Sequence, residues 1–321
     1  MDEGLLVGDV GGTNARFALA VQRGEWLRIE RFEVLSGEGF PAFSDALRHY
    51  LDQTGVRAEA ACIAVAGPVR DGQVHLTNRD WWISESGIRE SFGVSRALLI
   101  NDFVAMARAV PELEPEAFEL IFDGEPVGMA PVIVAGPGTG FGVSTLVPEA
   151  DGRWRVLAGE GGHIAYAPRT DLERELACIL SRDHGYVSNE LVASGSGLDE
   201  VHAAFCEIYG IPVTRLTPAE MRIRADAGEA MYRSLIEVRA LAVMGAVGDL
   251  VLANGALGGV VLAGGVSERI ADFLKAPAAR ERFVLRGPMS DYLQRCPVRL
   301  LHDPVAPLIG AAAYFRQQHA G

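Results

Sequence analysis

Apolar residues in this chain gather in short, nearly continuous runs that end at glycine, proline or polar residues. Such runs are typical of strands buried in the sheet of an α/β protein. They predict strands at residues 4–10, 14–21, 26–34, 60–66, 97–100, 153–157 and 259–263. Apolar residues at helical spacing alternate with these runs and predict helices at residues 40–54, 102–110, 217–252, 266–274 and 306–318. The predicted fold class is therefore α/β, and the helix that begins at the Thr217–Glu220 capping box is expected to break near Gly228.

A glycine-rich hairpin occurs twice, at residues 5–20 and again at residues 132–147. Each copy is a short apolar strand, a Gly/Thr turn and a second strand, with the turns at residues 11–13 and 138–140. A glycine turn exposes backbone N–H groups and carries no Cβ atom that would block a phosphate oxygen. Because each copy opens one half of the chain, the pair predicts a duplicated fold that holds a polyphosphate from both sides.

The duplication divides the chain into two predicted domains. Residues 1–110 form the smaller N-terminal lobe and residues 111–305 the larger C-terminal lobe. A stretch rich in Pro, Glu and Gly at residues 111–131 is expected to hold the crossover between them. The small-residue helix at 306–318 is expected to pack back on the N-terminal lobe and complete it.

Composition excludes several classes of partner. The 321 residues carry a net charge of −13, which argues against a nucleic-acid or acidic-membrane surface. The most apolar stretch, residues 243–266, contains Asp249, Asn254 and several glycines, so a buried helix end, a turn and a strand are predicted rather than a membrane span. The first strand begins almost at the N-terminus, so no signal peptide is expected and the predicted location is cytoplasmic.

Cysteine and lysine usage narrows the chemistry further. The four cysteines are far apart and form no CxxC pair, so reduced, buried thiols are expected, with neither a zinc site nor a disulfide framework. Lys275 is the only lysine, so the chain lacks both the Walker A lysine and the strand lysine of protein kinases. A chain of this kind that binds ATP must use backbone amides, hydroxyls and Mg²⁺.

Two acidic positions follow predicted strands in the first half. By itself, Asp9 before a glycine turn is typical of a residue that accepts hydrogen bonds from local amides. Beside two phosphate-type turns, a carboxylate that holds Mg²⁺ through water becomes the favoured interpretation. Asn101-Asp102 ends a strand and opens a helix, where ligands of open α/β sheets collect and an ionised carboxylate is stabilised. A general base for a sugar hydroxyl and a helix cap are both consistent with Asp102.

The second half offers polar residues at turns. Glu160 and His163 flank two glycines and can bond vicinal sugar hydroxyls, although an ordinary surface turn has the same composition. Glu190 lies at a predicted helix start, where glutamate is more often solvated. Gly264-Gly265 follows a buried strand, where it can let an adenine ring lie flat on the backbone or serve as a plain strand-to-helix turn.

Taken together, these motifs resemble those of bacterial glucokinases of the proteobacterial type, in the hexokinase/actin-like ATPase superfamily. The matching runs extend from the first strand to residue 266, and they lie at residues 8–16, 76–78, 100–103, 138–143, 159–163, 188–190 and 262–266. Several are weak individually, but in this order and spacing they are highly specific.

The resemblance implies a two-lobed, ribonuclease H-like fold with duplicated mixed-sheet domains and a central cleft for the sugar. It implies that ATP phosphorylates D-glucose on the 6-hydroxyl to give glucose 6-phosphate and ADP, the first step of glycolysis, with Mg²⁺ and commonly as a homodimer. Asp102 would be the general base. The other implied contacts are with the sugar for Asn78, Asn101, Asp102, Glu160, His163 and Glu190, with the phosphates for Gly8, Asp9, Val10, Gly11, Gly12, Thr13, Gly138, Thr139 and Gly140, and with adenosine for Gly264 and Gly265.

The chain departs from related sugar kinases at two places, and its motifs leave alternative functions open. ROK sugar kinases carry a cysteine-rich zinc motif after their Glu-x-Gly-His run, and His163 here is followed by no such cluster, so no zinc is expected. Pro137 removes one amide from the second phosphate turn. A kinase for mannose or glucosamine is the alternative enzyme. A non-catalytic sugar sensor is disfavoured by the absence of a basic region and the presence of Asp102, and a chaperone-like or cytoskeletal ATPase by the predicted sugar-binding residues.

Overall fold

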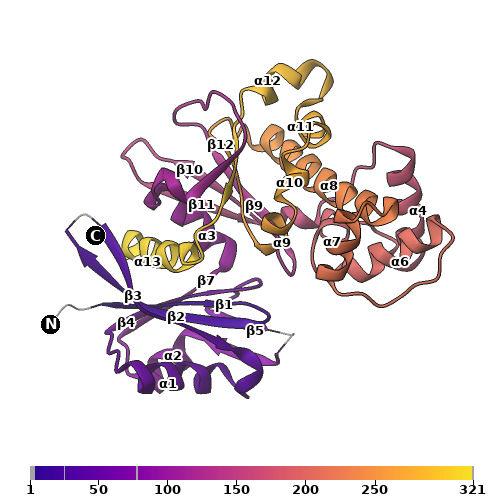
Figure 1. Ribbon diagram of the computed structural model, residues 1–321. Helices are drawn as coiled ribbons and strands as arrows, with labels where there is room; N and C mark the ends of the chain where they lie inside the picture. Colours follow the sequence, from indigo (N-terminus) through magenta and orange to yellow (C-terminus); the bar gives the residue numbers. More distant parts are fainter. Residues whose placement is uncertain (1–3, 25, 77–78, 320–321) are drawn as a thin grey trace. The chain divides into compact units, whose positions relative to one another are not determined.

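Two compact α/β units make up the chain in a computed structural model that describes residues 4–24, 26–76 and 79–319 (Figure 1). The first unit combines Met1–Ala117, Glu149–Ala158 and Asp303–Gly321, and the second combines Phe118–Pro148 and Gly159–His302. The sequence assigned residues 149–158 to the C-terminal lobe, but they cluster with the first unit because Trp154 and Val156 contact its C-terminal helix and core.

The first unit is built on a five-stranded mixed sheet in the order β3-β2-β1-β4-β7. Its strands are β1 (Leu5–Val10), β2 (Asn14–Arg23), β3 (Trp26–Ser36), β4 (Ala60–Val65) and β7 (Arg96–Asn101). β1, β2 and β3 are antiparallel neighbours, whereas β1, β4 and β7 run parallel. Every residue of β4 is buried, as its continuous apolar run predicts.

Helices cover this sheet and divide its core in two. They are α1 (Phe43–Thr54), α2 (Glu85–Phe92), α3 (Asp102–Ala109) and α13 (Ala306–His319), joined by a hairpin of β5 (Gln73–Leu76) and β6 (Trp81–Ser84). One core cluster includes Phe17, Tyr50 and Trp81. The other includes Val7 and Leu308, and there α13 contacts α3, β1 and β4. The C-terminal helix therefore packs on the first unit.

The second sheet of the chain has six strands in the order β11-β10-β9-β12-β13-β8, and all of them except β11 lie wholly within the second unit. Its strands are β8 (Phe118–Phe122), β9 (Val132–Pro137), β10 (Phe141–Pro148), β11 (Trp154–Gly159), β12 (Gly259–Leu262) and β13 (Val298–Leu301). β9 and β10 form the antiparallel hairpin, and β9, β12 and β13 run parallel. Each sheet thus contains a glycine hairpin whose first strand pairs with a parallel neighbour, which confirms the predicted duplicated mixed-sheet fold.

The helices of the second unit surround one large core. They are α4 (Asp171–His184), α5 (Asn189–Ala193), α6 (Leu198–Ile208), α7 (Pro218–Asp226), α8 (Ala230–Asn254), α9 (Gly265–Arg269), α10 (Ala271–Leu274), α11 (Pro277–Val284) and α12 (Ser290–Gln294). The capping box at Thr217 and the break after Asp226 are confirmed. The single helix predicted at 266–274 is wrong, because Ile270 leaves helical geometry at φ −112° and divides it into α9 and α10. Among the described residues, no helix is both long and apolar enough to cross a membrane.

Candidate active site

The first glycine turn, residues 11–13, joins β1 and β2. The Gly11 N–H donates to the Asn14 carbonyl at 3.0 Å and closes the turn. Two further hydrogen bonds hold the outside of the turn, from the Gly37 N–H to the Thr13 carbonyl and from Arg79 Nε to the Gly12 carbonyl. The Gly12 and Thr13 carbonyl oxygens therefore both accept hydrogen bonds within the protein. Gly8 and Val10 are buried within β1, whereas the turn itself is partly exposed.

Asp9 lies one residue from the end of β1 and is only 9% exposed. Its Oδ2 accepts a hydrogen bond from Arg16 at 2.8 Å, because the hairpin register places the two residues opposite each other. Burial raises the pKa of Asp9, and the facing Arg16 opposes that rise. The carboxylate therefore pairs across the hairpin.

A single carboxylate such as that of Asp9 suits Mg²⁺. This ion usually binds one or two protein carboxylates and completes its coordination shell with water and substrate phosphates. Within the described residues there is no cluster of three His, Cys, Asp or Glu side chains that could hold a metal ion by themselves. Asp9 could therefore contribute a single carboxylate to a metal ion that arrives with a phosphate ligand.

Asn101 and Asp102 occupy the junction between β7 and α3. Asn101 is the N-cap, since its Oδ1 accepts from the Phe103 and Val104 amides at 2.9 and 3.3 Å. Its Nδ2 donates to the Gly67 carbonyl at 3.2 Å, which fixes the amide plane. Asp102 is the first helical residue, and its Oδ1 accepts from the Phe103 N–H at 2.9 Å. The capping role that the sequence left open for Asp102 belongs to Asn101, and Asp102 is partly exposed at the helix N-terminus.

The second glycine turn, residues 138–140, belongs to the second unit and joins β9 to β10. The Gly138 N–H donates to the Gly140 carbonyl at 2.8 Å. The Gly138 and Thr139 carbonyls accept from the Gly195 and Ser196 amides at 2.8 and 3.0 Å. The turn is therefore fastened to the segment that follows α5.

Glu190 on α5 is hydrogen-bonded to the end of the same turn. Its Oε2 accepts from the Phe141 N–H at 2.7 Å, and its Oε1 lies 3.7 Å from Nε2 of His163. A Cβ atom on Gly140 would lie 2.7 Å from Oε2, so a larger residue there would require the Glu190 carboxylate to shift. His163 belongs to a 3₁₀ turn at Gly161–His163 that Glu160 precedes, and both side chains are exposed. The structure thus joins three sequence-predicted elements, Glu190, His163 and the turn.

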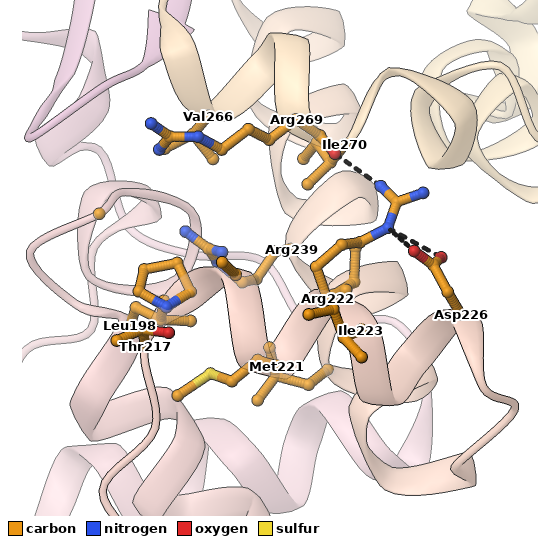
Figure 2. Close-up of a pocket in the computed structure, with 15 residues that line it drawn as sticks. Leu198, Thr217, Met221, Arg222, Ile223, Asp226, Arg239, Val266, Arg269 and Ile270 are labelled. Atoms are coloured by element: carbon orange, nitrogen blue, oxygen red, sulfur yellow. Dashed lines mark hydrogen bonds and ion pairs between the residues drawn. The ribbon is translucent and has the colours of Figure 1, made fainter.

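A pocket of about 710 Å³ lies in the second unit, beside the segment that begins at Gly264-Gly265 (Figure 2). Gly264 has φ +89°, and a Cβ there would lie 2.8 Å from the Pro137 carbonyl, so glycine permits close approach to the second glycine turn. The pocket has mostly apolar walls with some arginines among them, and its lining includes Leu198, Met221, Arg222, Arg239, Val266 and Ile270. Arg222 is bound to Asp226 and Asp272.

Two further sequence predictions concern Asn78 and the cysteines. Asn78 lies outside the described residues. Three of the four cysteines are buried and free, but Cys178 is exposed on α4, so the expectation that all four are buried is wrong. Residue 178 occupies the outer face of an amphipathic helix, where a thiol meets solvent.

Some contacts in these units were not predicted from sequence. The Arg16 partner of Asp9 could have been found from the hairpin register, because residues 9 and 16 face each other around the turn. The Phe141 amide and Arg239 carry no such local signal, since their partners lie 49 and 46 residues away.

Comparison with known proteins supplies independent information. A family model described as Glucokinase matches residues 6–318. A glucokinase of Chromobacterium violaceum is 42% identical over 311 residues, which cover 96% of this chain and 88% of that protein. A glucokinase of Caulobacter is 41% identical over 309 residues, with 96% and 93% covered. The crystal structure of a glucokinase from an Antarctic psychrotroph matches with a TM-score of 0.86 at 38% identity, over 99% of this chain and all of the other.

Proposed function

The chain belongs to the glucokinase family, and from that premise we propose how its residues bind and activate the two substrates. The reaction is ATP-dependent phosphorylation of D-glucose on the 6-hydroxyl, which yields glucose 6-phosphate and ADP. Phosphoryl transfer needs little covalent chemistry from the protein, so the residues must position the substrates and stabilise the developing charge.

We assign glucose binding to Asn101, Glu160, His163 and Glu190, each of which would form hydrogen bonds with sugar hydroxyls. Carboxylate oxygens accept from sugar hydroxyls, and the imidazole can donate or accept. The observation that carries this proposal is the carboxylate of Glu190, whose two oxygens face the Phe141 amide and the His163 ring. A residue bound at the end of a phosphate turn is well suited to orient a sugar toward the phosphate. Asn78 is proposed to contribute a further sugar contact.

Asp102 acts as general base on the 6-hydroxyl. Its Oδ1 accepts a hydrogen bond from the Phe103 N–H, and the N-terminus of α3 stabilises the ionised carboxylate, which is the form that can accept a proton. The 6-oxygen then attacks the γ-phosphorus, the bond from that phosphorus to the bridging oxygen breaks, and ADP leaves. The proton of the hydroxyl ends on the Asp102 carboxylate.

We assign triphosphate binding to residues 8–13, which are the end of β1 and the first glycine turn, and to the second glycine turn at residues 138–140. Amides and the Thr13 and Thr139 hydroxyls replace the absent Walker A lysine. Asp9 would hold Mg²⁺ through water, and bound Mg²⁺ would neutralise charge on the phosphates. The hydrogen bond from Arg16 would hold the Asp9 carboxylate in a fixed orientation until the metal binds.

Adenosine occupies the pocket beside Gly264-Gly265. The apolar walls suit a purine ring, and the approach of Gly264 to Pro137 puts this pocket next to the second phosphate turn in the same unit. We also propose a cytoplasmic location, since glycolysis uses cytosolic ATP, and a homodimer, as the resemblance to bacterial glucokinases implies.

The test is a coupled assay with Mg²⁺-ATP and a panel of hexoses, detected by a dehydrogenase specific for glucose 6-phosphate and, for other sugars, by ADP release. Glucose should give the highest kcat/KM, and 6-deoxyglucose should inhibit without turnover because it lacks the accepting hydroxyl. Faster turnover of mannose or glucosamine would assign a different hexose kinase. Glucose binding with no turnover of any hexose would instead indicate a sugar sensor.

A further inference from the structure

Arg239 is a buried cation with an unusual set of partners. It lies in the middle of α8 and is 5% exposed. Its Nη2 donates to the Ala193 and Ser194 carbonyls at 2.9 and 2.8 Å. Its Nε is buried without a partner in the described part of the chain, and no carboxylate there forms an ion pair with it.

A cation in this position is costly to maintain. Buried charges are normally paired, and desolvation without a counter-ion penalises the ionised form. Burial accordingly lowers the pKa of Arg239 to about 10. The two carbonyls are those at the C-terminal end of α5, which bear partial negative charge and are a natural site for an arginine. Because an apolar residue would be less costly to bury at this position, we interpret the arginine as serving to hold the end of α5 in place.

The end of α5 is connected directly to the second phosphate turn. Immediately after the carbonyls that Arg239 binds, the Gly195 and Ser196 amides donate to the Gly138 and Thr139 carbonyls. Arg239 therefore lies two hydrogen-bonded steps from the turn. It also lines the same pocket as Gly195 and Leu198, as Figure 2 shows for Arg239 and Leu198.

The other end of α5 is anchored independently. Ser188 caps it by accepting from the Leu191 amide, and Nδ2 of Asn189 donates to the Ile164 carbonyl. Glu190 has its own bond to the Phe141 amide. Loss of Arg239 should therefore loosen residues 193–196 and the phosphate turn more than it moves the sugar-binding carboxylate.

We propose that Arg239 is a positioning residue for the phosphate turn: it fixes the end of α5, and through Gly195 and Ser196 it sets the geometry of residues 138–140. This inference rests on the proposed binding of ATP phosphates at that turn. It assigns to a residue deep in α8 control over ATP use, with little effect on glucose recognition.

The experiment compares Arg239→Gln, Arg239→Lys and a matched control, Val247→Ala. Val247 is fully buried about two turns further along the same helix, so its truncation destabilises α8 at a distance from Arg239. Steady-state kinetics give kcat, KM for ATP and KM for glucose, and thermal unfolding gives Tm for each variant. Hydrogen exchange of the Gly195 and Ser196 amides reports on the turn without any dependence on turnover.

A charge-assisted hydrogen bond corresponds to roughly a 10- to 150-fold effect when it is lost. We expect Arg239→Gln to raise KM for ATP at least about tenfold, with KM for glucose changed less than about threefold. Arg239→Lys, which can still reach one carbonyl, should lie between Arg239→Gln and the wild type. Exchange at Gly195 and Ser196 should quicken in Arg239→Gln, and Val247→Ala should lower Tm and leave KM for ATP unchanged.

Several results would overturn the inference. One is Arg239→Gln with KM for ATP within twofold of the wild type, and another is an equal rise in both KM values. Unchanged exchange at Gly195 and Ser196 is a third. If Arg239→Gln does not fold, Arg239→Lys carries the test, and wild-type ATP kinetics and exchange in that variant refute the proposal. Failure of the wild type to phosphorylate glucose would refute the proposed function instead, and the exchange result would still stand.

Discussion

Glu173 is the most densely hydrogen-bonded buried carboxylate among the described residues, and its removal should have a large effect on stability. It is fully buried on α4. Its oxygens accept from Arg282 at 2.6 Å, from the Tyr166 hydroxyl at 2.8 Å and from the Thr170 amide at 2.8 Å. These contacts join the segment after His163 to α4 and α11.

The magnitude follows from the burial of both charges. Arg282 is 6% exposed, so Glu173→Gln leaves a buried guanidinium without a counter-ion. Breaking one side of a buried ion pair costs about 3–5 kcal/mol. For a domain of this size, about 2–4 °C of Tm is lost per kcal/mol, which predicts a decrease of roughly 6–20 °C.

The assay is thermal unfolding of Glu173→Gln at several pH values, with Glu175→Gln as control. Glu175 is exposed on the same helix, so its substitution should change the unfolding free energy by less than about 0.5 kcal/mol. The double variant Glu173→Leu/Arg282→Met should be more stable than Glu173→Gln, because it removes both charges. A Tm decrease below about 2 °C in Glu173→Gln would refute this explanation.

The same residue predicts a pH dependence. Burial by itself raises the pKa of Glu173, but the hydrogen bonds from Arg282, Tyr166 and the Thr170 and Arg169 backbone outweigh burial and hold it below its ordinary value of 4.5. The folded state then binds its proton less tightly than the unfolded state. The stabilisation is present above pH 4.5 and is lost as the pH falls through the lower folded pKa. The difference in Tm between wild type and Glu173→Gln should shrink in acid, and a difference that grows there would contradict this sign.

Three further predictions concern the candidate site and the thiols. Asp9→Asn should raise the Mg²⁺ concentration for half-maximal turnover roughly 10- to 100-fold, and an unchanged Mg²⁺ titration would remove Asp9 from the metal site. Gly140→Ala should lower kcat/KM for glucose at least about tenfold, because the new methyl would collide with Glu190 Oε2, and glucose titration calorimetry that shows normal affinity would contradict this. A thiol reagent should label one cysteine, Cys178, in the native enzyme and all four after unfolding, and rapid labelling of a second would show that a buried thiol is accessible.

The sequence predicted most reliably the elements that are buried or capped. The continuous apolar run at residues 60–66 and the capping box at Thr217 lead directly to β4 and α7. The hairpin of β5 and β6 was missed because its pattern is interrupted by polar residues, and its Trp82 is 69% exposed. β13 was missed because four residues are too short a run to distinguish a strand from a loop.

In the candidate site, too, the local features could be predicted from sequence and the long-range contacts could not. The glycine turns and the Asp102 position at a strand end are local features, so sequence reasoning could find them. The Arg239 bond to α5 spans 46 residues and depends on packing of α8 beside α5. Periodicity contains no information on such long-range contacts, so they could be identified only in the folded chain.

The central claim is that Asp102 accepts the proton of the glucose 6-hydroxyl. Its most direct test is kcat for Asp102→Asn beside the dissociation constant for glucose measured by calorimetry on the same preparation. We expect a loss of roughly 10²- to 10⁴-fold in kcat while glucose still binds, since removing a general base typically costs that much. Near-normal turnover in this variant would contradict it and exclude Asp102 as the base.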